Sequence, residues 1–215
     1  MILTVGNTKG GTGKSTIAVN LAIHRARQHL VLLVDGDEQQ SALAFTQLRN
    51  RPDYTAIALT GGLIHSKAHR LAKHYDDVII DVGGRDTGSF RAALTISDIL
   101  LIPIQPRTFD VWAMENVVKL VDEARTFNPK LKAIPILNLA EVQGKDNDSA
   151  CDNIIQYREL FAHYNPGDLM KIMIIMRRKV YSESIARGLG MIEMRPVNKK
   201  AILEFELLVQ HIWSQ

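Results

Sequence analysis

The sequence predicts an α/β fold in which a mostly parallel, twisted sheet carries helices on both faces. Short apolar segments of strand length alternate along the chain with longer amphipathic segments, as is typical of parallel strands joined by right-handed helical crossovers. Segments 30–34 and 99–104 are apolar without alternating polar positions, as expected of strands covered on both faces. A glycine-rich turn between the first strand-like and the first helix-like segment is the third indication.

Length and composition limit the classes of protein to consider. At 215 residues the chain suits one domain, which we expect to span residues 1–215. Its 26 Lys and Arg against 23 Asp and Glu give a formal charge of +3, which permits an acidic partner without requiring one. Cys151 is the only cysteine, so neither an intrachain disulfide nor a cysteine-based metal site can form. Because no apolar segment approaches the roughly 20 residues of a transmembrane helix and a strand at residue 2 leaves no room for a signal peptide, we expect a cytoplasmic protein.

Residues 7–16, here called the phosphate loop, read Asn-Thr-Lys-Gly-Gly-Thr-Gly-Lys-Ser-Thr. An apolar segment, 2–5, precedes the loop, and apolar residues at helical spacing follow it from 17 to 22. This is the strand, glycine loop, helix order that binds phosphate, with backbone N–H groups and the helix N-terminus facing the anion. Lys14 is expected on the β- and γ-phosphates and the Ser15 hydroxyl on magnesium. The predicted phosphate-binding residues are Gly10, Gly11, Thr12, Gly13, Lys14, Ser15 and Thr16.

Two positions of the phosphate loop depart from the general pattern. Thr8 stands where a glycine is usual, and Lys9 adds a second lysine beside it. The alternative interpretation is a flexible glycine turn with solvated lysines, which the flanking strand and helix patterns disfavour.

Three carboxylates are predicted to lie near the phosphate loop. Asp35 ends the apolar segment 30–34, Asp37 follows it, and Asp81 ends the apolar residues 78–80. Ligands bind at the carboxyl ends of strands in such sheets. We expect Asp37 in the site and Asp81 directed toward Mg²⁺, whereas Asp35 equally fits a cap of the next helix. A simple turn residue is the alternative for Asp81, and the glycine turn 82–85 lies where a γ-phosphate sensor would be.

The other elements follow from periodicity. We expect strands at 54–59, 98–104, 131–139 and 170–176, and a polar loop at 141–149. Helices are expected at 63–74, 89–95, 111–127, 150–163 and 198–213. His65 and His69 are four residues apart in the first of these helices, but no acid or cysteine reinforces a metal site. We interpret them as part of a solvated face.

With these motifs, the sequence resembles the ParA/MinD family of deviant Walker-A ATPases. The phosphate loop carries the family's additional lysine, and segment 35–39 resembles its Asp-x-Asp-Pro-Gln with Glu38 in place of proline. Segment 75–81 resembles its second acidic strand, although residues 82–84 read Val-Gly-Gly instead of Thr-Pro-Pro. Segment 178–193 is similar to the late part of small plasmid-partition ATPases. The ParF-like proteins, which lack an N-terminal helix-turn-helix domain, fit best.

The resemblance implies a P-loop NTPase domain that binds ATP or ADP with Mg²⁺ and hydrolyses ATP slowly. Lys14 and Asp37 would be catalytic, with Asp37 orienting the attacking water. Lys9 would also be catalytic, crossing the interface of an ATP-dependent homodimer to bind the partner's nucleotide. The implied metal residues are Ser15, Asp35 and Asp81, and Asn138 is expected to contact the adenine.

The implied function is partition or segregation of plasmid, chromosome or other cargo. The ATP dimer would bind nonspecific DNA at the nucleoid, and a ParB-like adaptor protein would stimulate hydrolysis. From residue 165 to 215 the chain has eight Lys and Arg against five Asp and Glu. The candidate DNA contacts are Arg177, Arg178, Lys179 and Arg187, for which a solvated helix face is the alternative.

Two other function classes are disfavoured. A MinD-like positioning switch usually has a basic amphipathic helix that binds the membrane, but residues 201–213 contain two acids and no Lys or Arg. We therefore expect this segment to pack on the core. An iron-protein relative would need cluster cysteines, which one cysteine cannot supply.

Overall fold

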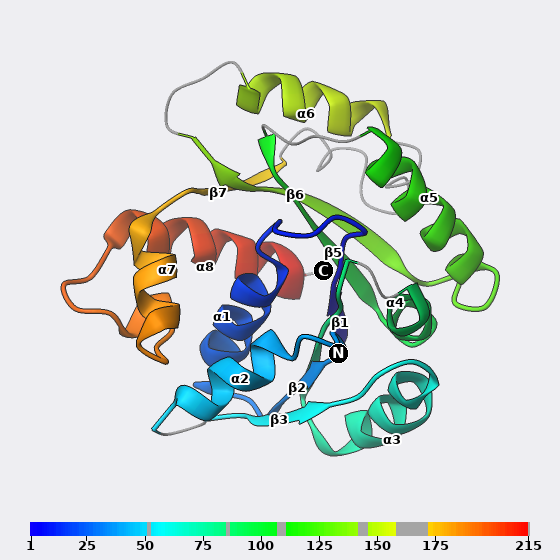
Figure 1. Ribbon diagram of the computed structural model, residues 1–215, viewed down its shortest axis with the longest axis horizontal. Coiled ribbons are helices and arrows are strands. Elements are labelled where there is room, and N and C mark those ends of the chain that lie inside the picture. Colours follow the sequence, from blue (N-terminus) through cyan, green and yellow to red (C-terminus); the bar gives the residue numbers. More distant parts are fainter. Residues whose placement is uncertain (51–52, 85–86, 107–110, 142–145, 158–171, 215) are drawn as a thin grey trace.

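The computed structural model describes residues 1–215 except 51–52, 85–86, 107–110, 142–145, 158–171 and 215. Seven strands form one sheet in the order β3-β2-β4-β1-β5-β6-β7 (Figure 1). Every pair of neighbouring strands is parallel, which confirms the predicted fold class. The strands are β1 Ile2–Val5, β2 Val31–Asp35, β3 Thr55–Ala58, β4 Asp77–Asp81, β5 Ile99–Ile104, β6 Lys132–Ala140 and β7 Met173–Met176.

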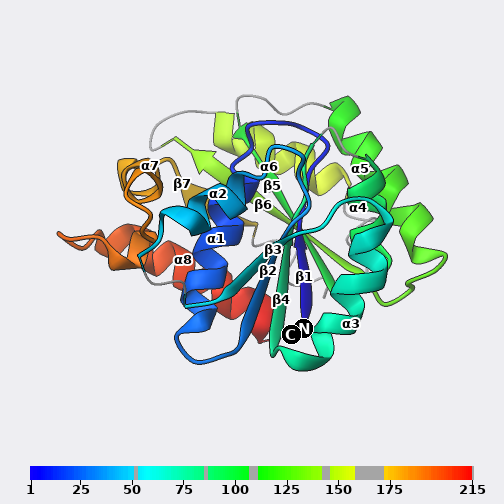
Figure 2. The same cartoon turned by 60° about the horizontal axis from the view of Figure 1, so that its bottom comes forward.

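Helices cover both faces of the sheet (Figure 2). One layer contains α1 Lys14–Ala26, α2 Ser41–Leu48, α7 Lys179–Ala186 and α8 Lys199–Trp213. The other contains α3 His69–Leu71, α4 Thr87–Leu94, α5 Val111–Arg125 and α6 Asp146–Gln156. Successive strand residues enter opposite cores, as Leu3 and Ile2 do. This is why the strands read as continuously apolar.

Strand order brings the predicted carboxylates together. In register, Val5 of β1 lies opposite Asp81 of β4, and Asp81 lies opposite Asp35 of β2. The connection after β1 crosses toward β2, whereas the one after β4 crosses to β5 on the other side of β1. The phosphate loop therefore leaves the sheet at its topological switch point, where ligands bind in doubly wound folds.

Several element predictions need correction. The helix expected at 63–74 is a π-helical turn Ile64–Ala68, the short α3 and a 3-10 turn Ala72–His74. Helix α6 begins at Asp146, inside the predicted loop 141–149, and the expected helical residues 158–163 lie outside the described residues. Helix α7 was not predicted, because it has no side-chain N-cap and no acid in its first turn.

Helix α8 packs on the core as expected. Its residues Phe205, Leu208 and Ile212 are buried in the cluster that also contains α1 and α7. Asn198 caps the helix by accepting a 3.1 Å hydrogen bond from the Ala201 N–H. Among the described residues, no helix is both long and apolar enough to cross a membrane.

Candidate nucleotide-binding site

The phosphate loop has the backbone expected of an anion cradle. Gly11 and Gly13 have φ angles of 75° and 84°, in the left-handed region that favours glycine. A Cβ atom at Gly10 or Gly11 would meet nothing within 4 Å, so this side of the loop is open. Helix α1 begins at Lys14 without a side-chain cap, which leaves its first N–H groups available to an anion.

Three amide side chains link the phosphate loop by hydrogen bonds to the neighbouring strand ends. Asn7 Nδ2 donates to the Pro103 carbonyl at 2.8 Å, and Gln105 Nε2 donates to the Gly11 carbonyl at 2.6 Å. Asn138 Nδ2 donates to the Thr12 carbonyl at 2.7 Å. The loop is thus fixed to the ends of β5 and β6.

Asn138, the predicted adenine contact, packs against the phosphate loop. Asn138 is 3% exposed, and a Cβ atom on Gly13 would lie 2.4 Å from its Nδ2. The amide therefore packs against the loop backbone and helps to position the loop, and its contact with adenine stays a prediction.

Lys14 is buried among the predicted catalytic groups. Its side chain crosses the loop, and Nζ donates to the Lys9 carbonyl at 2.9 Å. Burial lowers the pKa of Lys14, while Asp81 and Asp37 act in the opposite direction. The ammonium group therefore lies within the field of both carboxylates.

Asp81 is a buried carboxylate beside Ser15. It is 1% exposed, and burial, with a contribution from Asp35, raises its pKa to about 7, although the Ser15 hydroxyl opposes the rise. By geometry neither carboxylate oxygen has a hydrogen-bond partner among the described residues, so the Ser15 hydroxyl acts on Asp81 without a well-formed hydrogen bond. A buried carboxylate of this kind is a natural cation ligand, so the structure brings two of the predicted metal residues together.

Asp35 is bonded to backbone at both oxygens. Oδ2 accepts from the Leu43 N–H at 2.8 Å and Oδ1 from the Asp37 N–H at 3.1 Å. Burial raises its pKa, while these two N–H groups lower it. The contacts favour the capping alternative, in which Asp35 fixes the start of α2 and the loop that carries Asp37.

Asp37 lines a cavity of about 530 Å³ in front of the phosphate loop. Its Oδ1 accepts from the Gln39 N–H at 3.0 Å. The other walls come from Gly84 and from the apolar side chains Phe45 of α2 and Ile185 of α7. The predicted water-orienting carboxylate and the predicted phosphate cradle therefore share one cavity.

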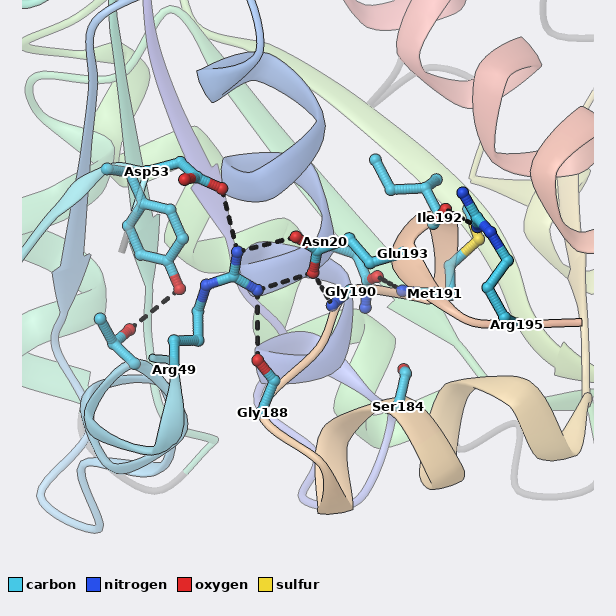
Figure 3. A network of polar contacts seen from close by, with 12 residues as sticks. Asn20, Arg49, Asp53, Ser184, Gly188, Gly190, Met191, Ile192, Glu193 and Arg195 are labelled. Carbon is cyan, nitrogen blue, oxygen red and sulfur yellow. Dashed lines mark hydrogen bonds and ion pairs between the residues drawn. The ribbon is translucent and has the colours of Figure 1, made fainter. Parts of the chain in front are cut away.

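A polar network ties the late segment 188–193 to the elements around this cavity (Figure 3). Arg49, just after α2, donates to both carboxylate oxygens of Glu193 at 2.8 and 3.0 Å. It also donates to Asp53 at 3.0 Å and to the Gly188 carbonyl at 3.3 Å. Asn20 of α1 accepts from the Met191 N–H at 2.8 Å.

Sequence reasoning missed this network. Arg49 and Glu193 are 144 positions apart, and no local pattern pairs them. The only local signal in the sequence is Gly188. This residue has a left-handed φ of 65°, and a Cβ atom there would lie 2.6 Å from the Leu48 carbonyl oxygen.

The four predicted DNA contacts divide into two pairs. Arg178 forms a two-point ion pair with Glu204, and Arg177 lies 3.0 Å from Glu141. Lys179 and Arg187 are exposed and line a second cavity of about 630 Å³, here called the basic groove. Its other basic residues are Arg195, Lys199 and Lys200, and Glu183 also lines it.

The interpretation of His65 and His69 as solvated agrees with the structure. Both are exposed, and His65 Nδ1 lies 2.9 Å from the Thr95 hydroxyl. No group of three or more His, Cys, Asp or Glu residues in the described part of the chain is arranged to hold a metal ion.

Comparison with known proteins agrees with this geometry. Residues 3–196 match the family described as the CobQ/CobB/MinD/ParA nucleotide binding domain. The maintenance of carboxysome distribution protein A from Halothiobacillus neapolitanus is 24% identical over 214 residues, 98% of this chain and 95% of that protein. A protein ParA from Rhizobium radiobacter is 28% identical over 126 residues, 57% of this chain and 56% of that protein.

Solved structures share the fold. Apo McdA from Cyanothece superposes with a TM-score of 0.75 at 18% identity, with 98% of each chain covered. A plasmid partition protein from Borrelia burgdorferi bound to AMPPNP gives 0.70 at 18% identity, covering 99% of this chain and 98% of that one. With its phosphate loop, its parallel sheet and a family match over most of its length, this chain belongs to the CobQ/CobB/MinD/ParA nucleotide-binding family and is of the ParA/MinD type.

Proposed function

We propose that this chain is a partition-type ATPase that dimerises on ATP, binds DNA nonspecifically in that state and hydrolyses ATP slowly to position a cargo. The observation that carries the proposal is the shared cavity, where a glycine cradle, Lys14 and Asp37 face one another beside the buried Asp81. The relatives named for carboxysome distribution and for ParA support a positioning role.

The residues around the cavity fit ATP with Mg²⁺. The open backbone at Gly10 and Gly11 admits phosphate oxygens. Asp81, whose two buried oxygens lack hydrogen bonds to described residues, and the neighbouring Ser15 hydroxyl supply the oxygen ligands that Mg²⁺ prefers. Bound Mg²⁺ would supply charge neutralisation at the phosphates.

Catalysis then consists of positioning and charge compensation. Lys14 exchanges its bond with the Lys9 carbonyl for phosphate oxygens, which its neighbouring N–H groups also bind. Asp37 accepts a hydrogen bond from the attacking water and directs it in line with the γ-phosphate. Asp35 acts indirectly, because its bonds to the N–H groups of Asp37 and Leu43 hold this loop on α2.

Lys9 is assigned to the partner's ATP. The Lys14 ammonium already lies on the same loop and within the field of Asp37 and Asp81, so a second lysine on the same phosphates would be redundant. A cation delivered across the dimer interface instead acts as an arginine finger does in trans. ATP joins two subunits in this arrangement, and hydrolysis releases them.

The basic groove is the proposed DNA surface. Lys179 and Arg187 lie there with Arg195, Lys199 and Lys200, whereas the guanidinium groups of Arg177 and Arg178 have carboxylate partners. Each phosphate neutralised adds about 0.9 to the slope of log affinity against log salt, and a dimer doubles the number of contacts. An adaptor protein that stimulates hydrolysis and a location at the nucleoid complete the proposal.

Retention on nonspecific DNA tests this function. The protein is passed over immobilised DNA with ATP, ADP or no nucleotide, at two salt concentrations. We expect retention with ATP only, weaker at higher salt, and lost in a Lys199→Ala/Lys200→Ala variant. Arg91→Ala, an exposed change on α4 in the opposite helical layer, is the control and retains binding.

Two outcomes contradict the proposal. Equal retention with ATP, with ADP and without nucleotide would show that ATP does not control DNA binding. Binding to anionic lipid vesicles with no binding to DNA favours the membrane-positioning alternative. Phe205, Leu208 and Ile212 of α8 are buried in the core and so are not available to a lipid surface, which argues against that alternative.

A further inference from the structure

The end of β4 is hydrogen-bonded to the ends of both neighbouring strands, β1 and β2. The Val82 N–H donates to the Val5 carbonyl at 3.2 Å, and the Gly36 N–H donates to the Asp81 carbonyl at 2.7 Å. Val82 is fully buried. Gly83 and Gly84 therefore follow directly after a buried, hydrogen-bonded residue.

Gly83 packs directly against the carboxylate of Asp37. A Cβ atom at Gly83 would lie 2.7 Å from both Cγ and Oδ2 of Asp37, and 2.9 Å from Oδ1. The three nearest atoms all belong to this one carboxylate. The Asp37 carboxylate thus occupies the space that a side chain at position 83 would need.

Gly84 packs against a different part of the site. A Cβ atom there would lie 2.9 Å from the Lys9 carbonyl carbon and 3.0 Å from the carbonyl oxygens of Lys9 and Thr8. The Lys9 carbonyl is also the group that Lys14 Nζ contacts. Gly84 therefore contacts backbone atoms of the phosphate loop, whereas Gly83 contacts side-chain atoms of Asp37.

Neither glycine is required for its backbone conformation. The glycines with positive φ in the described chain are Gly11, Gly13, Gly61 and Gly188. Alanine at 83 or 84 therefore tests the contact itself and not a strained backbone.

We infer that Gly83 is a positioning residue for the water-orienting Asp37, and that Gly84 sets the phosphate loop against the same segment. This inference rests on the proposed ATP hydrolysis and concerns how its geometry is held. A methyl group at 83 forces the Asp37 carboxylate back by roughly 1 Å to reach ordinary contact distance. A shift of that size costs a reaction on the order of 100-fold when the displaced group must align reacting atoms.

The two glycines make a matched pair of variants. Gly83→Ala is expected to lower single-turnover ATP hydrolysis on the order of 100-fold, with the ATP dissociation constant within about threefold of wild type. Gly84→Ala must move backbone of the phosphate loop and is expected to weaken ATP binding by about tenfold or more. The split between rate and affinity separates positioning of Asp37 from general damage to the fold.

A double-mutant cycle with Asp37→Ala decides whether Gly83 acts through Asp37. In the Asp37→Ala background the clash is gone, so adding Gly83→Ala should leave the hydrolysis rate unchanged within about twofold. The same cycle is read in thermal unfolding without nucleotide. Gly83→Ala should lower Tm by about 2–4 °C with Asp37 present and by less than about 1 °C in the Asp37→Ala background.

Three results overturn the inference. These are an equal loss of rate in both backgrounds, an equal loss of Tm in both backgrounds, or a Gly83→Ala variant that loses affinity instead of rate. A wild-type protein that binds ATP without hydrolysing it contradicts the proposed function instead. In that case the unfolding cycle still decides the Gly83 contact.

Discussion

Arg49→Ala is predicted to destabilise the protein strongly, because it breaks a buried charge network. The Arg49 side chain is 4% exposed and donates to Glu193 twice, to Asp53 and to the Gly188 carbonyl. Burial acts against its charge, but Glu193 and Asp53 outweigh it and raise the pKa of Arg49. Removing one partner of a fully buried ion pair costs about 3–5 kcal/mol. Because both carboxylates are partly exposed, we expect about 2–4 kcal/mol, or roughly 5–15 °C in Tm for a chain of this length.

Thermal unfolding with a matched control tests this reasoning. Arg91→Ala removes an ion pair with Glu123 in which both side chains are 52% exposed. Such surface pairs contribute at most about 1 kcal/mol, so its Tm should stay within roughly 3 °C of wild type. A similar Tm for the Arg49→Ala variant and wild type, or equal losses in the two variants, would refute the energetic role given to the network.

Two further predictions concern the cavity. Without nucleotide or metal, the Asp81 carboxyl has a pKa of about 7, raised from 3.8, so the stability it contributes is complete below pH 3.8 and is lost as pH rises through 7. Asp81→Asn, which cannot ionise, should therefore raise the free energy of unfolding relative to wild type at pH 8 by on the order of 4 kcal/mol at most. At pH 5, between the two pKa values, the gain should be about 1.5 kcal/mol, and near pH 3 it should vanish. A difference in stability that is independent of pH contradicts this. Asn138→Ala should weaken ATP and GTP binding alike, by about tenfold, since it releases the Thr12 carbonyl; a loss confined to ATP would support the adenine role.

Local sequence pattern was sufficient to predict the site residues whose place follows directly from the backbone of the element that carries them. The phosphate loop needs glycines, an adjoining strand and an adjoining helix, and all are written within residues 2–26. Asp37 and Asp81 follow apolar strands, and the carboxyl ends of parallel strands meet at one edge of the sheet. For these residues, position in the sequence already implied position in the site.

The local sequence pattern did not predict the directions in which the side chains of Asn138 and Asp35 point. At the end of β6 the register with β7 shifts between Asn138 and Ala140, and Leu139 has a φ of 57°. An irregularity of this kind re-aims a side chain, and it accompanies the turn of Asn138 under the loop. The role of Asp35 depended equally on a contact with Leu43 that spacing alone does not fix.

The sequence pattern also did not predict ion pairs between residues that are far apart in the chain. The run Arg177-Arg178-Lys179 looked uniformly available to phosphate in the sequence. In the fold, Arg178 lies against Glu204 of α8 and Arg177 against Glu141 after β6. Charge composition therefore located the basic region but not which of its residues have carboxylate partners.

Sedimentation velocity tests most directly whether two subunits share ATP through Lys9. Wild-type protein should sediment as a dimer with ATP and as a monomer with ADP or without nucleotide. Lys9→Ala should bind ATP yet remain a monomer, whereas Lys14→Ala should not bind nucleotide at all. Sedimentation that does not depend on nucleotide, or a Lys9→Ala variant that still dimerises with ATP, would contradict the account.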